Sequence, residues 1–180
     1  MTYQKAFDSS EYKSRLFKVK NHMNEKGFDM LICQDPANMC WLTGFDGWSF
    51  YTPQAVLVHS SEEWPIWFGR EQDAKSATMT TDIPESNIVP FSEPLVHHGT
   101  LHPFDELCDY IKLRKWERTR IGVDFDAHYY TARAHKHLYT GLPNAKISDN
   151  KELIFILNRY LFAGFIEGVA YPNVTIFFIV

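Results

Sequence analysis

Short apolar runs separated by helical segments are the feature of this sequence that most constrains its fold. Each run is four to six residues long, the length of a buried strand, and together they cover residues 28–33, 55–59, 64–68, 88–91 and 121–125. Helical segments are expected around them, at 8–27, 70–80, 102–111 and 130–141. Helices that alternate with strands are typical of α/β domains. We therefore predict a layered α/β domain with a mixed β-sheet flanked by helices.

The ends of these segments carry the expected capping and turn residues. Asp8 and Glu11 have the spacing of a capping box, and Gly27 is a natural stop for the first helix. The dipeptide at 35–36, Asp-Pro, is predicted to turn the chain away from the first strand. The dipeptide at 102–103, His-Pro, places a proline at the start of a helix.

Composition and charge exclude several classes of function. The chain has 180 residues, enough for one compact domain, and a net charge of −4 without a basic patch. Nucleic acid and anionic membranes are therefore not expected partners. The cysteines, Cys33, Cys40 and Cys108, are odd in number and lack metal-ligand spacing. We expect buried free thiols in a reducing compartment, and a cytoplasmic location because no signal peptide begins the sequence.

The composition changes after Leu153. From there to Val180 the only charged residues are Arg159 and Glu167, and Pro172 further interrupts the apolar stretch. A membrane-spanning helix needs about 20 apolar residues in succession. We therefore do not expect this segment to cross a membrane.

An aromatic, glycine-containing segment lies between the first two predicted strands. Residues 35–42 read DPANMCWL, and residues 43–54 read TGFDGWSFYTPQ. Gly44 and Gly47 permit tight turns or a close approach of the backbone. Trp48, Phe50 and Tyr51 would then stand beside a rigid sheet edge, where aromatic rings can form a wall for a small ligand.

These strings resemble the N-terminal domain of the creatinase/prolidase family, which includes aminopeptidase P. In that family a DP-x-N turn leads into an (F/Y)LTG(F/Y) element, and the GWSFY continuation looks most like ectoine hydrolases, which open the ring of a cyclic amidine. PIWFGREQDAKSA at 65–77 resembles the hairpin strand and arginine-bearing turn of the group. IGVDFD at 121–126 resembles its last strand, and GLPNAK at 141–146 resembles the stretch before the domain exit.

The resemblance implies a three-layer α/β domain with a ribonuclease H-like arrangement. It places the reaction in a following C-terminal domain with the pita-bread fold, where peptidase members hold two divalent metal ions. It also implies a homodimer in which the N-terminal domain of one subunit lends residues to the active site of the other. We expect no catalytic residue, metal ligand or cofactor in this chain itself.

The end of the sequence departs from that family. After Asp149 there is no further aspartate, and after His137 no further histidine, so the carboxylates and histidine of a two-metal site are not supplied. We assign residues 1–152 to the N-terminal domain and 153–180 to an atypical apolar tail, with the catalytic domain absent. A truncated or frame-shifted gene would produce this tail, as would a natural stand-alone domain; we favour the former.

The expected function is that of an accessory domain of an ectoine hydrolase-like or Xaa-Pro peptidase-like enzyme that cleaves a C–N bond. Its roles would be to support dimerisation and to form part of the wall of the neighbouring subunit's active site, where a small molecule or peptide binds. An alternative is a stand-alone module for ligand binding or dimerisation, or a gene remnant without function. Whether this chain is an enzyme by itself stays open, and we expect it to be inactive alone.

Four residues are candidates for contacting a substrate across the dimer. Arg70 would present its guanidinium to a ligand carboxylate; the alternative is a surface salt bridge with Glu71 or Asp73. Trp48, Phe50 and Tyr51 would line the neighbouring subunit's pocket; the alternative is plain packing.

The histidines are not expected to bind metal. We place one group, His97, His98 and His102, on a solvent-facing loop, with His102 opening a helix. We expect the other group, His128, His135 and His137, to be solvated on or near a polar helix face.

Overall fold

The computed structural model describes residues 6–150, which form a six-stranded sheet in the order β4-β3-β2-β1-β5-β6. The strands are β1 (Met30–Cys33), β2 (Ala55–His59), β3 (Ile66–Arg70), β4 (Ile88–Phe91), β5 (Arg120–Val123) and β6 (Lys146–Asp149). The helices are α1 (Ser9–Lys26), α2 (Pro36–Thr43), α3 (Glu71–Thr80), α4 (Pro103–Leu113) and α5 (Ala132–Gly141). Short 3₁₀ turns lie at Ser49–Tyr51, Glu85–Asn87 and Glu93–Leu95.

The direction of the strands decides which loops meet. β2 is antiparallel to both of its neighbours, β1 and β3, whereas the β3–β4, β1–β5 and β5–β6 pairs are parallel. Five of the six strands therefore end at one edge of the sheet, which we call the carboxyl edge, and β2 begins there. The loops that follow β1, β3, β4 and β5 are thereby brought to the same edge, as is the loop that leads into β2.

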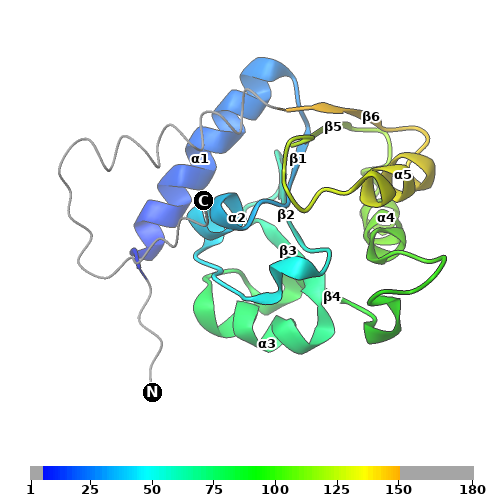
Figure 1. The fold of residues 1–180 in the computed structure, drawn as a ribbon. Helices are drawn as coiled ribbons and strands as arrows, with labels where there is room; N and C mark the ends of the chain where they lie inside the picture. The colour runs from blue at the N-terminus through cyan, green and yellow to red at the C-terminus, as the bar shows by residue number, and fades with distance from the viewer. Residues whose placement is uncertain (1–5, 151–180) are drawn as a thin grey trace.

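Helices cover both faces of the sheet, which makes the domain three layers thick (Figure 1). On one face, α4 and α5 pack side chains such as Phe104, Leu107 and Leu138 against the sheet. On the other face, α1, α2 and α3 contribute side chains such as Leu16, Met39 and Ala77. Alternate residues of each buried strand serve the two faces. The predicted fold class, a three-layer α/β domain with a mixed sheet, is confirmed.

The helix boundaries follow local chemistry, with one correction. Asp8 is the N-cap of α1 but makes no side-chain capping hydrogen bond, so the predicted capping box is wrong. Gly27 ends α1 in the left-handed conformation at φ 71°, as expected. The buried face of α1 includes Tyr12, Leu16, Val19 and Met23, which recur at helical spacing.

Two elements differ from the sequence-based expectation. The segment after Asp35 is helix α2 rather than a loop-rich stretch, and the Asp35 carboxylate accepts hydrogen bonds from the backbone N–H groups of Ala37 and Asn38. The strand at 121–125 is not the last one, because β6 (Lys146–Asp149) follows it and pairs with β5. β6 is mostly exposed, so it lacks the continuous apolar run by which the other strands were found.

The three cysteines are free thiols, with Cys33 and Cys108 buried and Cys40 half-buried. Burial raises the pKa of the Cys40 thiol to about 11 and that of Cys108 to about 12. No helix within residues 6–150 combines the length and the apolar character needed to cross a bilayer. The tail predicted at 153–180 lies outside the described residues.

Candidate functional site at the carboxyl edge

The aromatic loop between α2 and β2 begins at a position that requires glycine. Gly44 follows α2 with φ 80°, a left-handed conformation that other residues adopt at a cost. A Cβ atom there would also lie 2.8 Å from the Tyr12 hydroxyl oxygen. Glycine therefore lets the chain turn out of α2 without strain, and the rings that follow are placed by that turn.

The three rings of the loop differ in exposure. Trp48 is 81% exposed and Tyr51 57%, whereas Phe50 is half-buried. Phe50 lies between them, with its ring centroid 5.7 Å from that of Trp48 and 6.2 Å from that of Tyr51. Trp48 and Tyr51 thus face the solvent, and both rings pack against Phe50.

A fourth ring, Tyr129, joins this group from the loop that follows β5. Its centroid is 5.3 Å from that of Phe50. Tyr129 could not be found from sequence, because 79 positions of chain separate it from Phe50. Pairing of β5 with β1 in parallel is what brings the two loops together at the carboxyl edge. We call Trp48, Phe50, Tyr51 and Tyr129 the aromatic surface.

Arg70 is the last residue of β3 and lies at the same edge. Its Nε donates a hydrogen bond to Oε1 of Glu93 at 2.6 Å, and Nη2 donates to the same oxygen. The partner is therefore Glu93, from the turn after β4, and not Glu71 or Asp73. Parallel pairing sets Arg70 beside Phe91, two residues before Glu93. The hydrogen bond to Glu93 is the main cause of a raised Arg70 pKa.

Buried polar groups also gather at the carboxyl edge. Gln34 follows β1, Gln54 precedes β2, and Asn150 follows β6, and all three are buried. One amide atom of each has no hydrogen-bond partner within residues 6–150. A buried polar atom left without a partner costs about 1–3 kcal/mol, and internal water usually satisfies such atoms. The carboxyl edge is therefore more polar inside than the rest of the core.

The part of the chain that is described does not supply a metal site. Within residues 6–150, no three histidine, cysteine, aspartate or glutamate side chains lie together so that they could hold a metal ion. Asp124, at the end of β5, has a pKa raised mainly by burial and further by nearby carboxylates that include Asp35. The two divalent ions implied by the family resemblance therefore have no fitting donors among these residues.

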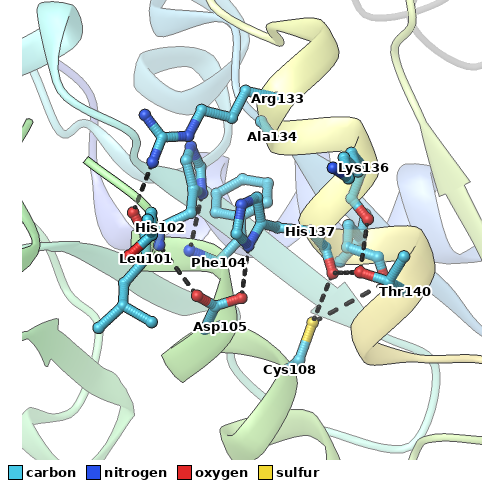
Figure 2. Close-up of polar contacts among 12 residues, drawn as sticks. Leu101, His102, Phe104, Asp105, Cys108, Arg133, Ala134, Lys136, His137 and Thr140 are labelled. Carbon is cyan, nitrogen blue, oxygen red and sulfur yellow. Dashed lines mark hydrogen bonds and ion pairs between the residues drawn. The ribbon is translucent and has the colours of Figure 1, made fainter. Parts of the chain in front are cut away.

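Two of the histidines, His102 and His137, belong to a cluster of polar contacts between α4 and α5 (Figure 2). His102 is the N-cap of α4: its Nδ1 accepts a hydrogen bond from the Phe104 N–H, and Asp105 accepts one from the His102 N–H. Asp105 also bonds His137 of α5, with 2.6 Å between Oδ1 and Nδ1. Arg133 of α5 donates to the carbonyl oxygens of His98 and Leu101 at 2.7 and 2.9 Å. The cluster ties α4 and the loop before it to α5.

The predictions for the histidines were correct in part. His102 opens a helix as expected, but it is only 6% exposed, because α5 covers it. His137 is half-buried and bonded to Asp105, so it is not simply solvated. His97 is exposed, as expected of a loop. Burial, with His137 and Arg133 nearby, lowers the pKa of His102 to about 4.

Comparison with solved structures places the fold among the N-terminal domains of proline-directed peptidases. A proline dipeptidase from Streptococcus pneumoniae aligns with a TM-score of 0.62 at 17% identity, over 84% of this chain and 98% of that one. The N-terminal domain of the cytoplasmic peptidase PepQ from Mycobacterium tuberculosis aligns with a TM-score of 0.60 at 18% identity, over 80% and 98%. At this level of identity the likeness concerns the fold alone.

Sequence comparison gives closer relatives. The ectoine hydrolase of Halomonas elongata is 39% identical over 149 residues, which are 82% of this chain and 37% of that protein. An uncharacterised hydrolase/peptidase of Sinorhizobium fredii, y4tM, is 40% identical over 149 residues, 82% of this chain and 38% of that protein. The chain thus spans well under half of the length of these relatives. The model of the creatinase/prolidase N-terminal domain matches residues 15–157, and the chain belongs to that family.

Proposed function

We propose that this chain acts as the N-terminal accessory domain of an ectoine hydrolase-like or Xaa-Pro peptidase-like enzyme that cleaves a C–N bond. In this proposal the domain supports a homodimer and forms part of the wall of the neighbouring subunit's active site. The observation that carries the proposal is the aromatic surface, with Trp48 and Tyr51 exposed in the loop that enters the sheet at the edge where Arg70 ends β3. The chain itself would not carry out the reaction.

Exposed tryptophan and tyrosine rings are the side chains most often found at the centre of binding surfaces. Trp48 and Tyr51 are held from behind by Phe50, which is itself packed on Tyr129. The rings therefore lose little conformational freedom when a partner or ligand covers them. A preorganised surface of this kind fits the wall of a pocket better than it fits a solvated loop.

The relatives and the chemistry at this edge support a substrate class for this proposal. One relative at 39% identity is an ectoine hydrolase, and ectoine carries a carboxylate and a cyclic amidine. A guanidinium such as that of Arg70 binds carboxylates in a directional way, and aromatic faces attract delocalised cations. Peptides with a free carboxylate are the alternative substrate class, as in the proline dipeptidase with the same fold.

A chimera tests the proposal. The matching N-terminal region of the Halomonas elongata ectoine hydrolase is replaced by residues 1–152 of this chain, and ectoine hydrolysis is measured. We expect the chimera to retain activity, and Arg70→Ala or Trp48→Ala to raise its KM. An active chimera that is indifferent to both substitutions would reject the role of these residues.

Mixed dimers test whether the contribution crosses the interface. One subunit carries Arg70→Ala with an intact catalytic domain, and the other carries Arg70 with an inactivated catalytic domain. If Arg70 serves the neighbouring subunit, the mixture hydrolyses ectoine with the KM of the unsubstituted chimera, although one parent has a raised KM and the other is inactive. If the KM of the mixture stays raised, Arg70 acts within its own subunit or not at all.

A direct assay tests the inactivity of the chain alone. The purified 180-residue protein is incubated with ectoine and with Xaa-Pro dipeptides, with manganese or zinc added. Turnover clearly above that of a denatured control would contradict the accessory role. We further propose a cytoplasmic location, since the three cysteines are free thiols.

A further inference from the structure

The guanidinium of Arg70 already holds a carboxylate, and this carboxylate belongs to the protein. A guanidinium binds a carboxylate most strongly along an edge, where two N–H groups point the same way. Arg70 uses the edge formed by Nε and Nη2, and both of these nitrogens meet Oε1 of Glu93. That edge is the one a ligand carboxylate would otherwise take.

Glu93 does not use its full bonding capacity in this pair. Its second oxygen, Oε2, is buried and has no hydrogen-bond partner within residues 6–150. Two donors therefore converge on one oxygen instead of each taking an oxygen of its own. A free carboxylate that approached the same edge could accept both bonds with two oxygens, the geometry that arginine favours.

The backbone that carries Glu93 is anchored independently of Arg70. The Ser92 N–H donates to Oε2 of Glu106, on α4, at 3.0 Å. The Leu95 N–H donates to the Ser92 carbonyl oxygen at 3.0 Å, and the Leu95 side chain packs into the core. Glu93 thus lies at the start of a fixed turn, and its carboxylate stays within reach of Arg70.

We propose that Glu93 is an internal competitor that sets which ligands Arg70 accepts. This inference rests on the proposed ligand role of Arg70. A carboxylate can take the Nε–Nη2 edge only by displacing Glu93, so a simple acid binds poorly. A ligand that gains contacts elsewhere, for instance with the aromatic surface, can displace it. Glu93 is therefore a specificity-determining residue and not a catalytic one.

The test measures acetate binding to Arg70 in the 180-residue protein by NMR. The Nε–H signal of Arg70 is assigned by its loss in Arg70→Lys, and acetate is titrated against chloride at equal ionic strength. In the wild type we expect little response. In Glu93→Ala we expect a saturable shift of this signal, with an apparent affinity for acetate roughly tenfold higher.

Glu93→Gln is the second variant, because it keeps the size of the side chain and an acceptor oxygen while removing the charge. Its apparent affinity for acetate should lie between those of the wild type and Glu93→Ala. If the alanine variant does not fold, Glu93→Gln provides the test. Glu85→Ala, which removes an exposed carboxylate from an earlier turn, is the control for net charge and should behave as the wild type does.

Equal acetate responses in the wild type and both Glu93 variants would overturn the inference. A response in Glu85→Ala as large as in Glu93→Ala would also overturn it, because the effect would then be one of overall charge. The acetate result is separate from the chimera. If the KM of the chimera is unchanged by Arg70→Ala, the proposed ligand role of Arg70 fails even where Glu93 does compete for the guanidinium.

Discussion

His102, the N-cap of α4, and His137, within α5, stack with their ring centroids 5.1 Å apart and an angle of 24° between their planes. Asp105 binds the backbone of one and the ring of the other. Because the His102 ring accepts a hydrogen bond from the α4 backbone, it must be neutral at Nδ1. The contact between the two helices therefore depends on the protonation of a buried side chain.

Stability should fall as the pH drops from about 6.5 towards 4. The pKa of His102 is about 4 in the folded protein and close to 6.5 in the unfolded chain, so the unfolded chain binds more protons in this window. The full contribution is present above pH 6.5 and is lost as the pH falls through the window. We expect a loss of about 2 kcal/mol in the free energy of unfolding between pH 7 and pH 4.5, measured by urea titration.

His102→Asn removes the titration but keeps a residue that caps helices well. Its stability should vary less with pH in the same window than that of the wild type. His97→Asn changes an exposed histidine of the same loop and should leave the dependence intact. If His102→Asn shows the wild-type pH profile, another group is responsible.

Gly44→Ala should destabilise the domain by about 1–3 kcal/mol, because a side chain there is strained at positive φ and meets the Tyr12 hydroxyl. Gly99→Ala is a matched control, since a Cβ at Gly99 has open space around it. The control should be neutral or slightly stabilising. Urea unfolding of both variants measures the difference, and equal losses would contradict this account of Gly44.

Substitutions of Trp48 and Phe50 should differ in their effect on stability, because Trp48 is exposed and Phe50 is packed. Trp48→Ala should change the free energy of unfolding by less than about 0.5 kcal/mol, because the ring is largely in solvent. Phe50→Ala should cost about 1–2 kcal/mol, because it removes the ring that contacts Tyr51 and Tyr129. Thermal unfolding distinguishes them; a larger loss for Trp48→Ala would mean that Trp48 serves packing.

Replacing Arg15 by lysine should destabilise the domain more than replacing an exposed arginine does. It is 5% exposed, its Nη1 donates to the Trp41 carbonyl oxygen at 3.0 Å, and its guanidinium lies 4.0 Å from the ring centroid of Phe7. Lysine cannot reproduce this planar contact, so Arg15→Lys should cost about 1–3 kcal/mol. Arg118→Lys, on an exposed turn, should cost almost nothing, and urea unfolding compares the two.

The parts of the fold found from sequence are those with a strong local pattern. The first strand has an uninterrupted apolar run, and α1 has its apolar residues at helical spacing, so both were placed within two residues. β6 was missed because only Ile147 in it is apolar and partly buried. α2 was missed because it is short and apolar on nearly all sides, so it shows no face to recognise.

The candidate site was predictable only where it is continuous in sequence. Trp48, Phe50 and Tyr51 lie in one loop and were identified together. Tyr129 reaches them through the pairing of β5 with β1, and Glu93 reaches Arg70 through the register of β3 with β4. Strand order and register depend on packing over the whole sheet, so no local pattern predicts these partners.

The central position of β1 sets the order in which the sheet can assemble during synthesis. β1 to β4 are neighbours both in the sheet and along the chain, so this half can close on itself while later residues are still emerging. β5 lies about 90 residues after β1 in the sequence, so the two strands can pair only when that length of chain has been made. Contacts between such distant segments form slowly. Until then one edge of β1 has no paired strand, and the growing chain is exposed to aggregation through that edge.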